Sequence, residues 1–138
     1  MKLVIDDSIP RALFHELQAA GDLPTPEGSE VLHVSDHFAA TTEDRDWLAA
    51  VEGPGTAVLL LDCRSQRAAY LASLCRELEL ELLVFTVPRQ RLRLRSLAAW
   101  LRREWPHLPR LVDVEAAPFG YQFFQSRPAG QPTMIQNA

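Results

Sequence analysis

The chain has 138 residues, 47% of them hydrophobic and 23% charged, which is the size and composition of one ordinary globular domain. Its apolar runs, such as residues 57–61, reach only five residues, far short of the roughly 20 residues that a membrane-spanning helix needs, and we expect neither a membrane segment nor a signal peptide. The net charge is −4, and the two cysteines, Cys63 and Cys75, lack the spacing of a zinc site or a redox pair, so we expect a cytoplasmic protein.

Apolar runs and helix-period patterns alternate along the chain. Strands are predicted at residues 2–5, 31–34, 57–61 and 82–86, with a short final strand at 119–124. Helices are predicted between them at residues 9–20, 42–51, 66–78 and 91–105. This alternation predicts an α/β fold, with helices on both faces of a central, mainly parallel sheet of four to five strands. We expect the domain to cover residues 1–125, and residues 126–138 to form a C-terminal tail that is flexible or docked on a partner.

Acidic residues follow three of the predicted strands. Asp6 and Asp62 come directly after apolar runs, and Asp36 lies just beyond the second strand. Sites in parallel sheets lie beyond the carboxyl ends of the strands, so we expect these side chains to gather at one edge. An unpaired carboxylate is costly to bury there, which favours a functional role for Asp6 and Asp62.

Carboxylates gathered in this way predict a site for a divalent cation. Mg²⁺ and Mn²⁺ prefer oxygen ligands, usually a few carboxylates and water. Asp6, Asp62 and an acid from the helix after the second strand would be a minimal set. Such an ion lowers the pKa of a bound water and neutralises charge that develops on a phosphate. Asp7 and Asp44, each taken alone, fit a surface or helix-start acid equally well.

Charge is distributed unevenly along the chain. Residues 1–62 hold twelve acidic against three basic side chains, whereas residues 63–138 hold eleven arginines against six acids. An acidic half could hold a metal while a basic half holds nucleic-acid phosphates. The arginines expected to contact RNA are Arg64, Arg89, Arg91, Arg93 and Arg95. The alternative is a solvated helix face in a chain that uses arginine almost to the exclusion of lysine.

Three segments of the first half resemble a known family. They are MKLVIDDSIPRAL at residues 1–13, HVSDHF at 33–38 and TEDRDWL at 42–48. Together they resemble PIN-like domains of the toxin–antitoxin type, the VapC-like ribonuclease toxins. LRREWPHL at 101–108 and FGYQF at 119–123 look like the C-terminal part of that family, so the resemblance covers roughly residues 1–124.

The resemblance implies a metal-dependent endoribonuclease with a PIN-like α/β/α fold, which uses Mg²⁺ or Mn²⁺ and acts on RNA. A small antitoxin would silence it, an acidic antitoxin segment could bind the arginines, and domains of this type commonly form homodimers. The implied catalytic acids are Asp6, Asp44, Asp62 and Asp36. The implied metal ligands are Asp6, Asp44, Asp62, Asp7 and Asp46. Arg45 departs from the pattern, since it interrupts the acids before the tryptophan.

Two other interpretations remain open at this point. One is a catalytically silent PIN-like module that binds RNA or protein, which Arg45 favours. The other is a receiver domain of two-component signalling, in which Asp6, Asp7 and Asp62 would form an acidic phosphorylation pocket. Receivers need a lysine after the fifth strand, and the single lysine of this chain is Lys2.

Overall fold

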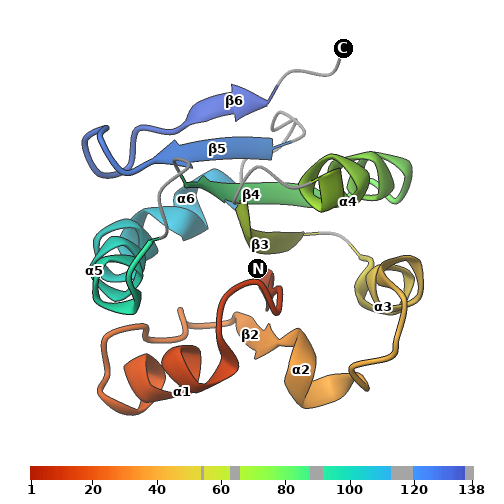
Figure 1. Ribbon diagram of the computed structural model, residues 1–138, viewed down its shortest axis with the longest axis horizontal. Coiled ribbons are helices and arrows are strands. Elements are labelled where there is room, and N and C mark those ends of the chain that lie inside the picture. The colour runs from red at the N-terminus through yellow and green to blue at the C-terminus, as the bar shows by residue number, and fades with distance from the viewer. Residues whose placement is uncertain (54, 63–65, 88–91, 113–119, 136–138) are drawn as a thin grey trace.

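The computed structural model describes residues 1–53, 55–62, 66–87, 92–112 and 120–135 (Figure 1). Its strands are β1 (Lys2–Ile5), β2 (Glu30–His33), β3 (Thr56–Asp62), β4 (Glu81–Thr86), β5 (Gly120–Phe124) and β6 (Thr133–Ile135). Its helices are α1 (Arg11–Ala19), α2 (Val34–His37), α3 (Asp44–Val51), α4 (Gln66–Glu77), α5 (Leu94–Glu104), the 3-10 turn η1 (Trp105–His107) and α6 (Leu108–Val112). Among these residues, no helix is both long enough and apolar enough to cross a membrane.

The strands form one sheet in the order β2-β1-β3-β4-β5-β6. Neighbouring strands from β2 to β5 run parallel, and β6 pairs antiparallel with β5. The mainly parallel α/β architecture predicted from the sequence is therefore confirmed. The predicted count of four to five strands is wrong, because residues 133–135 add a sixth strand from within the segment expected to be a tail. A run of three residues is too short to show the period of a strand.

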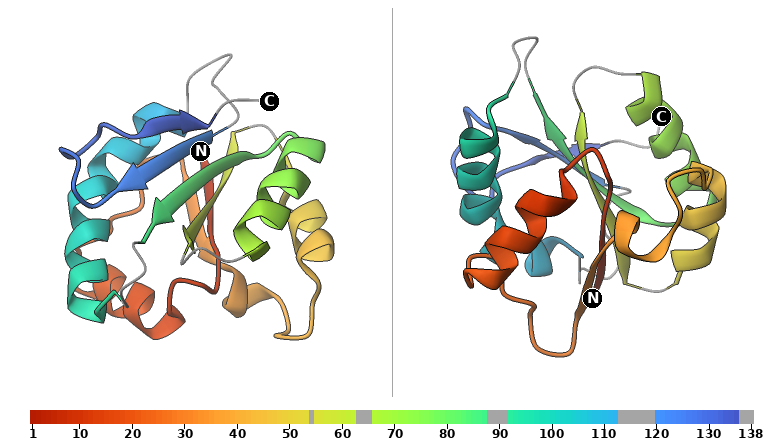
Figure 2. Two further views of the ribbon diagram at one scale, coloured as in Figure 1. Left: turned by 45° about the horizontal axis from the view of Figure 1, so that its top comes forward. Right: turned by 60° about the horizontal axis from the view of Figure 1, so that its bottom comes forward.

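Helices cover both faces of the sheet (Figure 2). On one face α1, α5, η1 and α6 enclose a core that includes Ala57 and Leu59 of β3. On the other face α3 and α4 enclose a second core that includes Val58 and Leu60. Because successive strand residues point to opposite faces and both faces are buried, β3 is apolar without interruption, as the sequence shows.

The β2–α2 junction differs from the expected strand. β2 ends at His33, and α2 begins at the next residue because His33 Nδ1 accepts the Ser35 backbone N–H at 3.1 Å. This contact caps the short helix by satisfying one of its free donors. Asp36 lies beyond the end of β2, as predicted, but within the short helix α2.

The sheet has one point where the strand order reverses, between β1 and β3. From β1 the chain continues to β2 on one side of β1, and it later returns to place β3 on the other side. Ligand sites in open parallel sheets lie outside the carboxyl ends of the strands at such a switch point. Asp6 follows β1 and Asp62 ends β3 at this edge.

Candidate active site

Asp6 is the buried acid at the switch point. Its side chain is 0% exposed, and its backbone N–H donates to the Leu59 carbonyl of β3 at 2.9 Å. The Ser8 backbone N–H donates to Asp6 Oδ2 at 3.0 Å, and the Leu61 N–H donates to Ser8 Oγ at 2.9 Å. Ser8 therefore holds the β1–α1 turn against β3.

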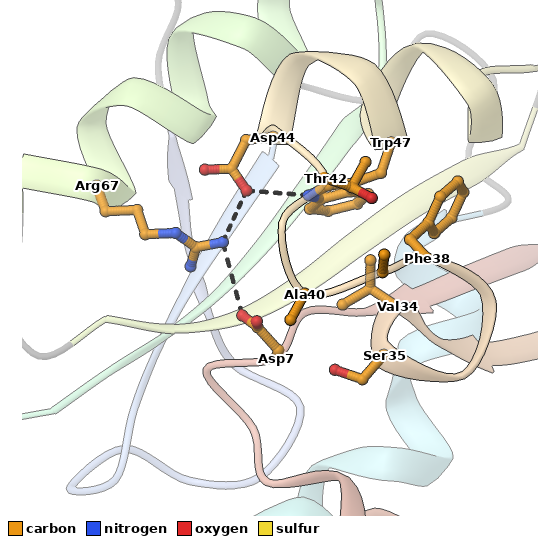
Figure 3. Close-up of a pocket in the computed structure, with 10 residues that line it drawn as sticks. Asp7, Val34, Ser35, Phe38, Ala40, Thr42, Asp44, Trp47 and Arg67 are labelled. Carbon is orange, nitrogen blue, oxygen red and sulfur yellow. Dashed lines mark hydrogen bonds and ion pairs between the residues drawn. The ribbon is translucent and has the colours of Figure 1, made fainter.

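Arg67 of α4 meets Asp6 through a two-pronged contact. Its Nη1 donates to Asp6 Oδ2 and its Nη2 to Asp6 Oδ1, both at 2.8 Å. The same Nη2 donates to Asp44 Oδ1 at 2.9 Å and lies 3.8 Å from Asp7 Oδ1. Figure 3 shows the guanidinium pointing from α4 toward Asp7 and Asp44. One nitrogen thus contacts carboxylates from three positions of the chain.

Asp44 is held in place by its own helix. It is the first residue of α3, and the Trp47 indole Nε1–H donates to its Oδ1 at 2.9 Å (Figure 3). Trp47 is itself buried in the core under α3. An acid at the first position of a helix is favoured by the helix dipole, and here the ring one turn later fixes its direction.

Contact between Asp6 and Arg67 shifts the pKa of each so that both stay charged. Burial works to raise the pKa of Asp6, but hydrogen bonds from Arg67 and Ser8 outweigh it and lower the pKa below its usual value. The hydrogen bond to Asp6 raises the pKa of Arg67 further above its already high value, against the effect of burial. Asp6, Asp7 and Asp44 with Arg67 carry a formal charge that stays negative, so the cluster favours a further cation over an anion.

His33 supports the loop that carries Asp6. It is buried, and its Nε2 lies 2.7 Å from the Ile9 carbonyl oxygen. Because Nδ1 accepts the Ser35 N–H, Nε2 must carry the proton and donate to Ile9. The ring therefore joins the β1–α1 turn to α2.

A pocket of about 190 Å³ opens beside Arg67. Asp7, Asp44 and Arg67 form its charged side, and Ser35 and Thr42 contribute hydroxyl groups. Val34, Phe38, Ala39, Ala40 and Trp47 complete the lining (Figure 3). The pocket therefore borders the exposed side of the ion cluster, opposite the fully buried Asp6.

The structure brings together some of the predicted acids and separates others. Asp6, Asp7 and Asp44 share Arg67. Asp62 lies half-buried at the end of β3 on the same edge, and the described contacts do not place its carboxylate on Arg67. The exposed Asp46 follows Asp44 by two positions on α3 and is not among the carboxylates described on Arg67.

Asp36 belongs to a different ion cluster. Its carboxylate accepts from Arg11 Nε and pairs with His15 Nε2 at 2.6 Å, both on α1. Desolvation acts to raise the pKa of Asp36, and the contacts with His15 and Arg11 outweigh it, so the pKa is lowered. The expectation that Asp36 lies with the catalytic acids is therefore not met, because α1 holds it outside the Arg67 cluster.

The arginine that lies among the acids is Arg67 and not Arg45. Arg45, which interrupts the acidic run, points to α4 and donates to Glu77 Oε2 at 3.0 Å. Arg67, which the sequence analysis did not single out, occupies the acidic site. One feature of the sequence could have identified it: Arg67 lies in the first turn of α4, where the helix dipole disfavours a cation without an acidic partner.

The predicted RNA contacts are described only in part. Arg64, Arg89 and Arg91 lie outside the described residues. Arg93 and Arg95 are exposed at the start of α5, which follows β4. β4 is parallel to β3, so the start of α5 lies toward the same edge of the sheet as Asp6 and Asp62.

The donor set suits a divalent cation in kind, but its arrangement does not. Mg²⁺ takes oxygen ligands at about 2.0–2.1 Å. The oxygens of Asp6, Asp44 and Asp7 lie 2.8, 2.9 and 3.8 Å from Arg67 Nη2. They are therefore spaced around a nitrogen at hydrogen-bond and ion-pair distances, which are longer than the distances to a metal ion. Within the described ranges, no group of three or more His, Cys, Asp or Glu side chains is placed to hold a metal ion. As folded, the site fits a guanidinium rather than a resident metal.

Comparison with known families gives one match. A family model described as a PIN-like domain matches residues 1–86, which is more than half of the chain and ends with β4. No curated protein and no solved structure matches the chain. Domains of this family are generally nucleases and usually use divalent metals. The matched segment contains Asp6, Asp44 and Arg67, and the chain belongs to the PIN-like domain family.

Proposed function

We propose that this protein is an endoribonuclease of the PIN-like family that hydrolyses RNA phosphodiester bonds and depends on Mg²⁺ or Mn²⁺. One observation carries the proposal: Asp6, Asp7 and Asp44 converge on a single point at the switch point of the sheet. Asp6 and Asp44 come from separate elements, and a buried carboxylate is costly unless a cation compensates it. An arrangement of this kind is what cleavage of an anionic backbone needs once a cation stands among the acids.

The arginines at the start of α5 support RNA as the substrate. Arg93 and Arg95 are exposed and lie toward the same edge of the sheet as the acids. Arginine contacts phosphate oxygens through two parallel hydrogen bonds, which fixes a strand relative to the site. Arg64, Arg89 and Arg91, which lie outside the described residues, are proposed from the sequence to contact RNA as well.

The toxin of a toxin–antitoxin pair is the biological setting we propose. The segments at residues 33–38 and 42–48 support it, because they resemble toxins of that type. In that setting a small antitoxin would bind the chain, and a homodimer would be its working form. Induced expression in a bacterial host should then arrest growth, and Asp6→Asn should relieve the arrest at an equal protein level.

A second candidate function is a silent PIN-like module that binds RNA or protein without cutting. Arg67 favours it, since the guanidinium occupies the point where the acids converge. Arg45, which raised this alternative from the sequence, gives it no support because it pairs with Glu77. The receiver alternative gains nothing from the family match.

Cleavage of a labelled single-stranded RNA separates the two candidates. With Mn²⁺ present, wild type should cut, while Asp6→Asn and Asp44→Asn should each lose at least about a hundredfold in rate, a loss typical for a removed site group. Glu16→Gln, an exposed carboxylate on α1, is the control and should cut like wild type. RNA that binds to wild type but stays intact would support the silent module. Equal cutting by wild type and Asp6→Asn would remove Asp6 from the site.

A further inference from the structure

We propose that Arg67 is an internal counter-cation that competes with a divalent metal ion for Asp6 and Asp44. The free chain would then take up the metal only when the guanidinium leaves these carboxylates. The inference rests on the proposed function for the kind of ion that competes. Its basis is that the acids are the kind of ligand a divalent ion prefers, whereas their spacing fits the guanidinium of Arg67.

The two cations cannot occupy the site together. Arg67 engages both oxygens of Asp6 and one oxygen of Asp44. A metal ion that took the same oxygens would lie within a few ångströms of the guanidinium, and two positive charges at that distance repel strongly in a buried site. Uptake of the metal therefore requires that Arg67 withdraw.

Arg67 has room to withdraw. Its side chain is 37% exposed, in contrast with the fully buried Asp6. The pocket of about 190 Å³ lies beside the guanidinium and is lined by hydroxyl groups that can accept its hydrogen bonds. We infer that the ion pair opens toward this pocket.

Withdrawal is opposed by the burial of Asp6. If Arg67 left without replacement, the fully buried Asp6 carboxylate would lose two hydrogen bonds of 2.8 Å from a cation. A buried charge without a partner is strongly unfavourable. A divalent ion can supply that compensation, but it first has to displace the guanidinium, which lowers its apparent affinity for the free chain.

Removal of Arg67 should therefore strengthen metal binding. Mn²⁺ binding to RNA-free protein can be measured by the loss of the free-ion signal in electron paramagnetic resonance. We expect Arg67→Gln to bind Mn²⁺ roughly tenfold more tightly than wild type or better, a modest gain for the removal of one positive charge beside the ion. Arg45→Gln is the matched control, since Arg45 is an arginine paired with an α4 carboxylate outside the cluster, and it should bind like wild type.

A second variant keeps the test decisive if Arg67→Gln does not fold. Arg67→Lys retains a positive charge but not the two-pronged contact, and it should bind Mn²⁺ with an affinity above that of wild type. The proposal is overturned if every folded Arg67 variant binds Mn²⁺ no more tightly than wild type. If the variants bind Mn²⁺ more tightly but neither they nor wild type cleave RNA, the ribonuclease proposal fails and the competition stands. If wild type cleaves RNA but the variants bind Mn²⁺ no more tightly, the competition fails and the ribonuclease proposal stands.

Discussion

Arg67 and Asp6 form a two-pronged ion pair, with both nitrogen–oxygen distances at 2.8 Å, between the first turn of α4 and the end of β1. The pair joins segments 61 residues apart and spans the point where the strand order reverses. Because Asp6 is fully buried, the pair is both a structural contact and the centre of the candidate site.

Loss of Arg67 should destabilise the fold in the absence of metal. Arg67→Gln should lower the free energy of unfolding by about 3 kcal/mol, the lower end of the range for a buried pair that loses one partner, because Arg67 is partly exposed. Urea denaturation at neutral pH with a chelator measures this. Arg45→Gln breaks a pair in which both side chains are exposed, so its free energy of unfolding should stay close to that of wild type. A smaller loss for Arg67→Gln than for Arg45→Gln would contradict the assignment.

The acid limb of the stability curve should depend on Asp6. Its pKa is lowered in the folded chain from the usual 3.8, so the unfolded chain binds a proton more readily than the folded one. The stabilisation is therefore present above about pH 4 and is lost as the pH falls from 3.8 toward the lower folded value. Asp6→Asn should show a shallower fall in unfolding free energy over this window than wild type. Parallel curves for the two proteins would show that Asp6 does not contribute.

His33 should be required for the loop that carries Asp6. His33→Leu removes the hydrogen-bond partner of two backbone groups, the N–H of Ser35 and the carbonyl of Ile9. The contact with Ile9 is buried, and a buried group left without a partner costs about 1–3 kcal/mol, so the variant should be destabilised by at least about 1 kcal/mol. Thermal unfolding followed by circular dichroism measures the change. His37→Leu, on the exposed side of α2, is the control and should melt like wild type.

Trp47 should orient Asp44 through its indole nitrogen. Trp47→Phe keeps a large ring in the core but removes the donor to Asp44 Oδ1. The free energy of unfolding should fall by about 1 kcal/mol, as for the loss of one hydrogen bond. The rate of RNA cleavage per folded molecule should also fall, because Asp44 would no longer be held in one orientation. Cleavage at the wild-type rate would show that Asp44 needs no support from this ring.

The sheet could be predicted because both of its faces are buried. The apolar runs that became β1, β3 and β4 have no polar alternation, and each ends in a polar residue or a turn. β6 could not be predicted, since its residues are mostly exposed and its pairing with β5 depends on a contact distant from any local pattern. The C-terminal domain boundary near residue 125 stays a prediction.

The acids of the site were predictable and its cation was not. Asp6 follows a buried strand and Asp44 begins a helix, and both positions can be found by pattern. Arg67 lies 23 residues from Asp44 and 61 from Asp6 in sequence, so whether it reaches them depends on how α4 lies against α3, which no local pattern contains. Arg45 and Arg67 show this: the arginine beside the acids in sequence points away from them, and the one brought by α4 lies among them.

Crystals of wild type and Arg67→Gln soaked in MnCl₂ test the central claim most directly, because manganese scatters anomalously and its position can be mapped. We predict an anomalous peak between Asp6 and Asp44 in Arg67→Gln, and in wild type either no peak there or a peak with Arg67 turned away into the pocket. A manganese ion between Asp6 and Asp44 in wild type, with Arg67 still bonded to both carboxylates, would contradict the account.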